Sequence, residues 1–428
     1  MVENTLDCKQ VDLEAIETFL RSSMQNIGCG ILGRILNTHL VHEEDTSVKC
    51  PQGHRARFVA YRRKLLMTVL GPVEIWRRYY YDARCRHGWC PKDSILDIAD
   101  TMFSPGVRNM MAYVGSRGPF KEGEEDLRRL AGLRIPAKSI ERLSRMIGRQ
   151  AEEYFWKQKQ GSDLRGLDQR TKRKTMYIAY DGTGIPVLKR ETVGRKGKDG
   201  EAKTREVKVG CIFTQTRMDD QGYPIRDEVS TSYVGACEKV EEFSRRIAHE
   251  AEIRGSCHTR RVCVIGDGAP WIWNIADEQF PTAIQIIDLY HAREHYGEVA
   301  RMVFPEKSTE GKRWIEKRKK ELNDGNIRAV VRALRRLTPR TKQAQHVCEK
   351  AIAYFQRNEH RMRYAYFRSL GLFVGSGVVE AGCKSLVGKR LKQSGMHWSV
   401  QAANNIIQLR SLFLSNHWDD FWEYRTAA

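Results

Sequence analysis

Two buried-strand patterns that each end in aspartate and glycine constrain the fold of this chain more than any other feature. Tyr177–Asp181 and Val262–Asp267 are rich in β-branched, aromatic and small apolar residues, and glycine follows each terminal aspartate. An apolar run that a turn signal closes is typical of a buried strand leading into a loop. The pattern therefore predicts an α/β core with two carboxylates at strand ends.

The charge balance indicates what these carboxylates act on. The 428 residues include 73 Lys and Arg against 53 Asp and Glu, a formal net charge of +20, and the excess is spread in patches. Such a surface is typical of proteins that contact phosphates over a wide area, although a basic protein with an ordinary solvated surface is the alternative. Two acids holding a cation against a polyanion predict Mg²⁺- or Mn²⁺-dependent phosphodiester chemistry on double-stranded DNA.

Composition excludes several other classes. With 41% hydrophobic and 29% charged residues, the chain has an ordinary soluble composition. No apolar run reaches the roughly 18 residues of a membrane span, and the acidic segment Met1–Asp7 lacks a signal-peptide pattern. Eleven cysteines without a signal favour reduced thiols, some buried and some metal ligands. We expect a cytoplasmic, nucleoid-associated protein with no membrane partner.

Hydrophobic spacing divides the rest of the chain into helical and strand-rich stretches. Residues 10–38 and 105–155 have helical spacing, whereas Arg57–Tyr81 alternates and predicts a small antiparallel sheet with Gly71 and Pro72 as its turn. Residues 300–370 combine helical spacing with few turn signals and predict an all-helical insertion. In the α/β region we expect strands at Tyr177–Asp181, Val207–Gln215, Asp227–Val234, Val262–Gly266 and Ile284–Asp288, and helices at Val240–Ala251 and Val400–Leu414.

Glu380 is the third candidate acid, and it precedes a helical pattern. A carboxylate in the first turn of a helix is also favoured by the helix dipole without any catalytic role. For Asp181 and Asp267 the structural alternative is an ordinary Asp-Gly turn. Because both follow buried strands of one α/β region, we favour a role in binding divalent metal for the two aspartates.

His291 follows Asp288 at the end of the fifth predicted strand. A histidine beside a strand-end acid can orient a phosphate or a water molecule, but Asp288 is equally typical of a helix cap. His291, Glu294 and His295 also match the inverted zinc-protease pattern. We interpret that match as coincidental, because it begins at a strand-to-helix junction in a basic protein.

Cysteine and histidine residues flank the predicted β-hairpin and have the outline of a zinc ribbon. The first pair is Cys50 and His54, and the second is chosen from Cys85, His87 and Cys90. Our predicted zinc ligands are Cys50, His54, Cys85 and Cys90. The spacing is irregular, so degeneration of a former zinc site remains the alternative.

Two basic regions are candidates for contact with DNA. Residues 124–148 predict a helix, a turn and a second helix with basic residues outward, as in a helix-turn-helix motif, although generic helix pairs share this pattern. The segment Lys189–Lys208 alternates basic residues with glycine and joins the first two core strands; a solvated loop is its alternative. The predicted contacts are Lys138, Arg142 and Arg145 in the first region and Arg195, Lys196, Lys198, Lys203 and Arg205 in the second.

Taken together, these motifs resemble the ISKra4-type transposases of bacterial insertion sequences, which are related to Mutator-like transposases. The resemblance covers most of the chain and is densest from Tyr177 to Phe421. Where such relatives tend to have paired CxxC motifs, this chain has Gly53 and His54 in that region and Asp82 before Cys85. The matching segments are Asp181–Gly184, Ala202–Gln215, Gly266–Trp273, Asp288–His291 and Glu380.

The resemblance implies a bacterial DDE transposase with an RNase H-like core, a catalytic triad of Asp181, Asp267 and Glu380, and a phosphate-positioning role for His291. It also implies binding to terminal inverted repeats and target DNA, as a homodimer or larger assembly. A nuclease or resolvase of this fold and a retired transposase that only binds DNA are the alternatives. The implied domains are an N-terminal helix with a zinc-ribbon-like module (1–98), a helix-turn-helix region (99–168), the first part of the core (169–299), the helical insertion (300–370) and the last part of the core (371–428).

Overall fold

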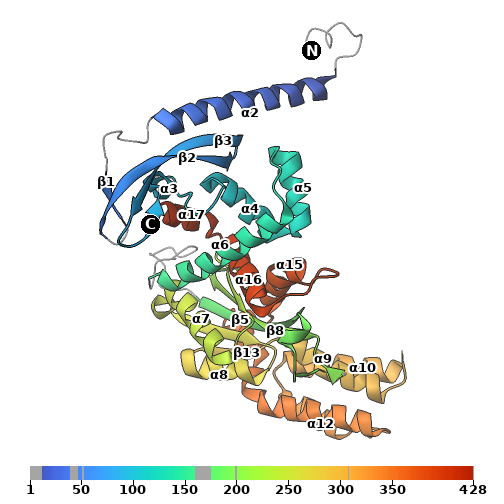
Figure 1. Ribbon diagram of the computed structural model, residues 1–428. Coiled ribbons are helices and arrows are strands. Elements are labelled where there is room, and N and C mark those ends of the chain that lie inside the picture. Colours follow the sequence, from blue (N-terminus) through green and yellow to red (C-terminus); the bar gives the residue numbers. More distant parts are fainter. Residues whose placement is uncertain are drawn as a thin grey trace. The chain divides into compact units, whose positions relative to one another are not determined.

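The computed structural model describes residues 12–38, 47–50, 53–159, 175–197, 200–306 and 308–427 of a mixed α/β protein (Figure 1). The chain forms two compact units, one of residues 1–144 with 422–428 and the other of residues 145–421. Within the described ranges, no helix is both long and apolar enough to cross a membrane.

The first unit contains a four-stranded antiparallel sheet, as the alternating pattern predicts. Its strands lie in chain order: β1 (Ser47–Lys49), β2 (Arg55–Thr68), β3 (Gly71–Asp82) and β4 (His87–Trp89). Buried Leu66, Val73 and Ile75 form a core against which Leu32 of helix α2 packs. The helices of this unit are α2 (Leu13–Thr38), α3 (Pro91–Ile95), α4 (Pro105–Arg117) and α5 (Phe120–Ala131), and α6 (Ala137–Lys157) begins in it.

The predicted hairpin turn at Gly71 and Pro72 is wrong by two residues. The turn consists of Val69 and Leu70, while Gly71 and Pro72 already belong to β3. Thr68 pairs with Gly71 across the hairpin, and the Thr68 hydroxyl donates to the Gly71 carbonyl at 2.8 Å. Glycine is needed at this position because Gly71 has a φ of +130°.

The second unit is built on a five-stranded sheet with the order β11-β8-β5-β12-β13. Strand β8 runs antiparallel to both of its neighbours, whereas β5, β12 and β13 are mutually parallel. Residues Thr175–Tyr180 are all buried, which is why this stretch reads as an unbroken apolar run. The strands are β5 (Thr175–Pro186), β8 (Thr204–Gln215), β11 (Ser232–Ala236), β12 (Arg261–Gly266) and β13 (Ile284–Ile287).

The third core strand begins at Ser232, so its predicted start at Asp227 is wrong. Asp227 is buried in a loop, where its carboxylate accepts from the Thr214 hydroxyl at 2.7 Å and from the Thr216 amide at 3.0 Å. Val229 has a φ of +54°, outside the strand region. Side-chain hydrogen bonds to Asp227 therefore take the place of the strand pairing that the pattern predicted for this part of the chain.

The second unit contains helices that come before, within and after the predicted helical insertion at residues 300–370 (Figure 1). The helix predicted at Val400–Leu414 has these bounds and packs against β11, with Gln408 donating to the Gly235 carbonyl at 2.9 Å. The helices are α7 (Val240–Ile253), α8 (Pro270–Gln279), α9 (Leu289–Val303), α10 (Thr309–Asn323), α11 (Ile327–Arg335), α12 (Lys342–Arg357), α13 (Tyr364–Ser369), α14 (Gly377–Gly382), α15 (Lys389–Leu391), α16 (Val400–Leu414) and α17 (Trp418–Ala427), which ends in the first unit.

Short elements complete the second unit. They are the two-stranded pairs β6 (Lys196–Gly197) with β7 (Gly200–Glu201) and β9 (Arg217–Met218) with β10 (Pro224–Ile225), and the 3₁₀ turns at Lys189–Glu191, Ser256–His258 and Glu359–Arg361. A π-helical segment, Cys383–Gly388, follows α14.

Candidate active site

Asp181 lies on β5, and Asp267 directly follows the neighbouring parallel strand β12. Ala179 of β5 is registered with Ile265 of β12. Continuing this register by two residues places Asp181 beside Asp267. Both side chains are partly exposed, so each carboxylate is open to solvent on a buried sheet. The sequence pattern predicted Asp181 at the end of its strand, and this is wrong. Strand β5 continues to Pro186 in antiparallel pairing with β8.

Two buried thiols lie against Asp181. The thiol of Cys383 makes a hydrogen bond with the Asp181 carboxylate. Burial, followed by the negative charge of Asp181, raises the pKa of Cys383 and of Cys211 well above that of a free thiol. Both thiols are therefore protonated near neutral pH, and Cys383 is a neutral donor to the carboxylate.

Helix α14 brings Glu380 to the same side of the sheet. The helix packs on β5 and β8, and the Cys211 thiol contacts the Val378 carbonyl at 3.9 Å. Glu380 is partly exposed and lies three residues before Cys383. Because residues three apart share an α-helical face, we expect Glu380 to lie on the face that meets Asp181. The π-helical turn begins directly after α14, a distortion that is frequent at functional sites.

The loop that carries Asp267 is held by the helical insertion. The Tyr354 hydroxyl on α12 donates to the Asp267 carbonyl at 2.9 Å, and the His295 ring lies 3.7 Å from the Tyr354 ring. The adjacent Gly268 has a φ of +105°, and a Cβ on it would come within 2.6 Å of the Tyr354 ring. Only glycine therefore suits the position after Asp267.

Asp288 is a structural cap. Its side chain is fully buried and accepts from the amides of Tyr290 at 2.6 Å and His291 at 2.8 Å. The second carboxylate oxygen accepts from the Ser376 amide, just before α14. The Asp288 carboxylate thus caps the N-terminus of α9 and also links α9 by a hydrogen bond to the segment that leads to Glu380.

His291 is engaged on the surface of α9. Its Nδ1 lies 3.3 Å from the Glu294 carboxylate, one helical turn on. Across the described ranges, the residues that bring three candidate ligand atoms within 4.8 Å of one another are Cys50, His54 and Cys85. Among the described residues, neither the three acids of the predicted triad nor the group of His291, Glu294 and His295 is gathered that closely.

The basic segment borders an open groove of about 820 Å³. Arg195, Lys196 and Arg205 line one part of it, and carboxylates that include Glu238 line another. Lys203 is exposed nearby in sequence but does not line the groove, and Lys198 lies outside the described residues.

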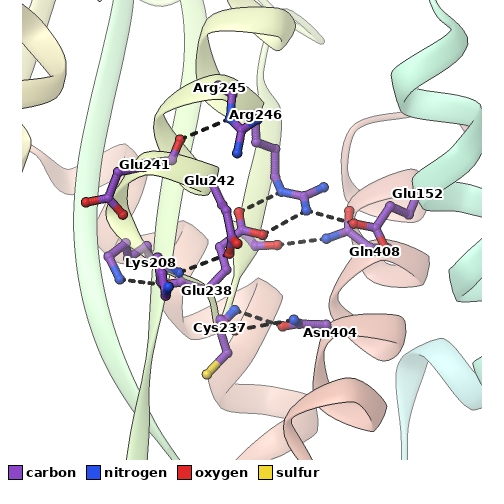
Figure 2. A network of polar contacts seen from close by, with 12 residues as sticks. Glu152, Lys208, Cys237, Glu238, Glu241, Glu242, Arg245, Arg246, Asn404 and Gln408 are labelled. Carbon is purple, nitrogen blue, oxygen red and sulfur yellow. Dashed lines mark hydrogen bonds and ion pairs between the residues drawn. The ribbon is translucent and has the colours of Figure 1, made fainter. Parts of the chain in front are cut away.

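A network of ion pairs fixes the wall of this groove (Figure 2). The guanidinium of Arg246 lies 2.9 Å from Glu238 and 2.7 Å from Glu152, and the Lys208 ammonium donates to the Glu238 carbonyl at 2.8 Å. The two carboxylates neutralise Arg246, whereas Arg195 and Lys196 of the basic segment are exposed and open to a polyanion.

The predicted helix-turn-helix residues lie on the expected elements. Helix α5 ends at Gly132, which has a φ of +71°, and α6 begins at Ala137. Lys138 and Arg142 are exposed and four residues apart on α6, while Arg145 is partly buried. Lys138 is paired with Glu141 at 2.9 Å. The helix pair is present, and its contact with DNA remains a prediction.

The first unit gathers three of the four predicted zinc ligands. The Cys85 sulfur lies 3.5 Å from the Cys50 sulfur and 3.4 Å from His54 Nδ1. Cys90 is elsewhere, at the N-cap of α3, where burial raises the pKa of its thiol and the nearest charges are Arg77 and Asp93.

A model of an uncharacterised protein family, UPF0236, matches residues 10–416. The chain belongs to this family. No curated protein matches it. Among solved structures, the Drosophila P element transposase strand transfer complex is similar with a TM-score of 0.26 and 10% identity, covering 78% of this chain and 83% of that one. A TM-score of this size does not establish a shared fold.

Three residues of this UPF0236 chain at the acidic site escaped the sequence analysis. They are Cys383, Tyr354 and Lys392, whose ammonium donates to the Thr183 hydroxyl on β5. The spacing of Cys383 from Glu380 is a signal that could have identified it, because the two share a helix face. Tyr354 and Lys392 carry no local signal, since they reach the site through tertiary packing.

Proposed function

We propose that this UPF0236 chain is a DDE transposase that cleaves and joins DNA at the ends of its own insertion sequence. The observation that carries the proposal is the position of Asp181 on β5 and of Asp267 directly after the adjacent parallel strand β12, with the Glu380 helix packed on the strand of Asp181. The ISKra4-type resemblance of the sequence points to the same three residues.

The topology of the sheet supports an RNase H-like core. In chain order the five strands are β5, β8, β11, β12 and β13, so the sheet reads third, second, first, fourth, fifth. Only the second strand is antiparallel to the others. This is the arrangement expected of an RNase H-like sheet, in which the first and fourth strands carry the first two acids.

The donor set fits a hard divalent cation. Asp181, Asp267 and Glu380 offer carboxylate oxygens, which Mg²⁺ and Mn²⁺ prefer, and the neighbouring thiols are buried and protonated. When bound, Mg²⁺ would supply Lewis-acid activation of the attacking oxygen and charge stabilisation at the leaving oxygen. The protein's own part is to hold the carboxylates: Cys383 donates to Asp181, and Tyr354 fixes the loop of Asp267.

DNA is the partner that fits the rest of the surface. Arg205 lies on β8, which pairs with the strand of Asp181, and Arg195, Lys196 and Lys203 lie in the segment that connects β5 to β8, so one strand pair carries both the first acid and these cations. In the proposed reaction these residues contact the phosphate backbone without reading sequence. His291 positions the scissile phosphate, and joining two element ends requires at least a dimer on DNA.

A cleavage and strand-transfer assay with Mg²⁺ tests the proposal, on DNA that carries the element's own ends. We expect activity in the wild type and a loss of at least a thousandfold in Asp267→Asn, which removes a charge at nearly constant shape. Asp220→Asn, an exposed aspartate outside the site, is the matched control and should stay active.

The remaining outcomes separate the alternatives. Equal activity of Asp267→Asn and wild type removes Asp267 from the site. Cleavage without joining identifies a nuclease or resolvase, and DNA binding with neither activity identifies a retired transposase.

A further inference from the structure

We propose that Cys50, His54, Asp82 and Cys85 form a structural zinc site in which Asp82 occupies the fourth position and Cys90 has no part. The proposal is independent of the transposase chemistry, because the site belongs to the small sheet of the first unit, whereas the three acids belong to the second unit. It also changes the predicted ligand set, which had Cys90 in place of Asp82.

The separations between the ligand atoms fit the edges of a zinc tetrahedron. With Zn–S near 2.3 Å and Zn–N near 2.0–2.1 Å, two ligands of a tetrahedral ion lie about 3.4–3.8 Å apart. The two sulfurs are 3.5 Å apart, and Cys85 Sγ is 3.4 Å from His54 Nδ1. A disulfide would bring the sulfurs to about 2.05 Å, so the thiols are placed as separate ligands.

Two tight turns present these side chains from the same end of the sheet. Cys50 and His54 close the turn between β1 and β2, with the Cys50 amide donating to the His54 carbonyl at 2.7 Å. Gly53 within it has a φ of +84°. Asp82 and Cys85 form the turn between β3 and β4, and β2 pairs with β3 through Arg57 and Tyr81 next to them.

Asp82 is the fourth ligand of the proposed site, and it lies beside Cys85, outside the three ligand atoms that are already within 4.8 Å of one another. It is 4% exposed, and its Oδ1 lies 3.2 Å from Cys85 Sγ. The same oxygen accepts from the amides of Arg84 at 2.8 Å and Cys85 at 3.0 Å, which leaves Oδ2 outside these bonds. A carboxylate can thus hold the turn with one oxygen and ligate with the other.

Cys90 belongs to another part of the fold. It caps α3, where the Asp93 amide donates to its carbonyl at 2.9 Å, and among the described residues it shows no contact with Cys85 such as the one that Asp82 makes. Among the described residues, the apolar cluster around the zinc-like turns has Cys50, Ala56 and Tyr80 as buried members, with partly buried Phe58 and Trp89 packed against them. A metal cross-link between the two turns therefore supplies stability that so small a core does not.

Zinc content of the purified full-length protein tests the proposal, measured by mass spectrometry after removal of loosely bound metal. We expect about one zinc per chain in wild type and in Cys90→Ser, and loss of zinc in Cys85→Ser. Absence of zinc from wild-type protein reconstituted with Zn²⁺, or its loss in Cys90→Ser, overturns the proposal.

Two substitutions of Asp82 distinguish a ligand from a residue that only orients Cys85. Asp82→Cys should keep zinc and bind it at least as tightly as wild type, because a thiolate replaces a carboxylate ligand. Asp82→Ala should lower the zinc affinity by more than the 10–100-fold that is typical of losing a residue that only orients a ligand. Chelator competition measures both, and Co²⁺ spectra should show two thiolate ligands in wild type and three in Asp82→Cys. Two thiolates in both proteins would overturn the role of Asp82.

Discussion

Cys383 shows how a single side chain can adjust the acidic site. Its thiol is a hydrogen-bond donor to Asp181, and its own pKa is raised by burial and by that carboxylate. A donor that remains neutral steadies one carboxylate oxygen without competing for a hard cation. The sequence analysis found Asp181 from the strand pattern but missed this partner, because the contact forms only when α14 packs on β5.

Substitutions of Cys383 should therefore distinguish the effect of its hydrogen bond to Asp181 from the effect of its side-chain volume. Cys383→Ser keeps a donor of similar size, whereas Cys383→Val removes it, and loss of a hydrogen bond to a charged group costs about 1.5–3 kcal/mol. We expect cleavage by Cys383→Val to fall by roughly tenfold or more at fixed Mg²⁺, and Cys383→Ser to stay within a few-fold of wild type. Cleavage rates over a Mg²⁺ titration measure the difference, and equal rates in the two variants would contradict a donor role.

Asp288 is a second residue whose role can be measured. Asp288→Ala removes a helix cap and leaves the Ser376 amide without its acceptor, so we expect a loss of roughly 2–4 kcal/mol in unfolding free energy. Denaturant unfolding measures the loss, with Asp220→Ala as an exposed control. A fully stable but inactive Asp288→Ala protein would assign Asp288 to the chemistry instead.

Among the elements, the contact between α12 and the loop after β12 links the helical insertion to the acidic site. The sequence pattern predicted both the strand and the helical insertion. It did not predict that Tyr354 would contact the Asp267 carbonyl, because helical periodicity identifies a buried face without identifying its neighbour. The errors at Gly71 and Asp227 have the same origin, since cross-strand pairing and side-chain capping decided those boundaries.

Gly268 makes this contact testable. Gly268→Ala puts a Cβ 2.6 Å from the Tyr354 ring at a φ of +105°, so we expect a loss of about 1–3 kcal/mol in stability and a displaced Asp267. When Tyr354 is also replaced by Ala, the part of the stability loss that comes from the clash between the Cβ and the ring should disappear. The part that comes from backbone strain at residue 268 should remain. Unfolding and cleavage assays of the four proteins form a double-mutant cycle, and strictly additive losses would show that the loop and α12 are not coupled.

For the whole molecule, net charge of +20 indicates a polyanionic partner but does not locate it. The fold places Arg195 and Lys196 near one edge of an open groove, and it neutralises Arg246 and Lys208 with carboxylates. Composition alone could not make this distinction, because it counts exposed and paired cations alike.

Salt dependence can test which cations meet DNA. Each phosphate contact contributes about −0.9 to the slope of log K against log salt concentration, so Arg195→Ala with Lys196→Ala should make the slope less steep by roughly 1.8. Arg260→Ala is the control, because Arg260 is exposed at the opposite end of β12 from Asp267. An unchanged slope in the double variant would place the DNA elsewhere.

Strand β5 continues past Asp181 to Pro186, and β8 starts at Thr204, so the intervening basic segment is carried at the tip of a paired ribbon. The five steps from Asp181 to Pro186 span about 17 Å at roughly 3.4 Å per residue, which is close to five base-pair steps of duplex. A rigid ribbon of this length would hold the basic segment at a fixed distance from Asp181. In a transposase, the distance between the bond that is cut and the phosphates that the basic segment contacts would therefore stay constant, whatever the sequence of that segment.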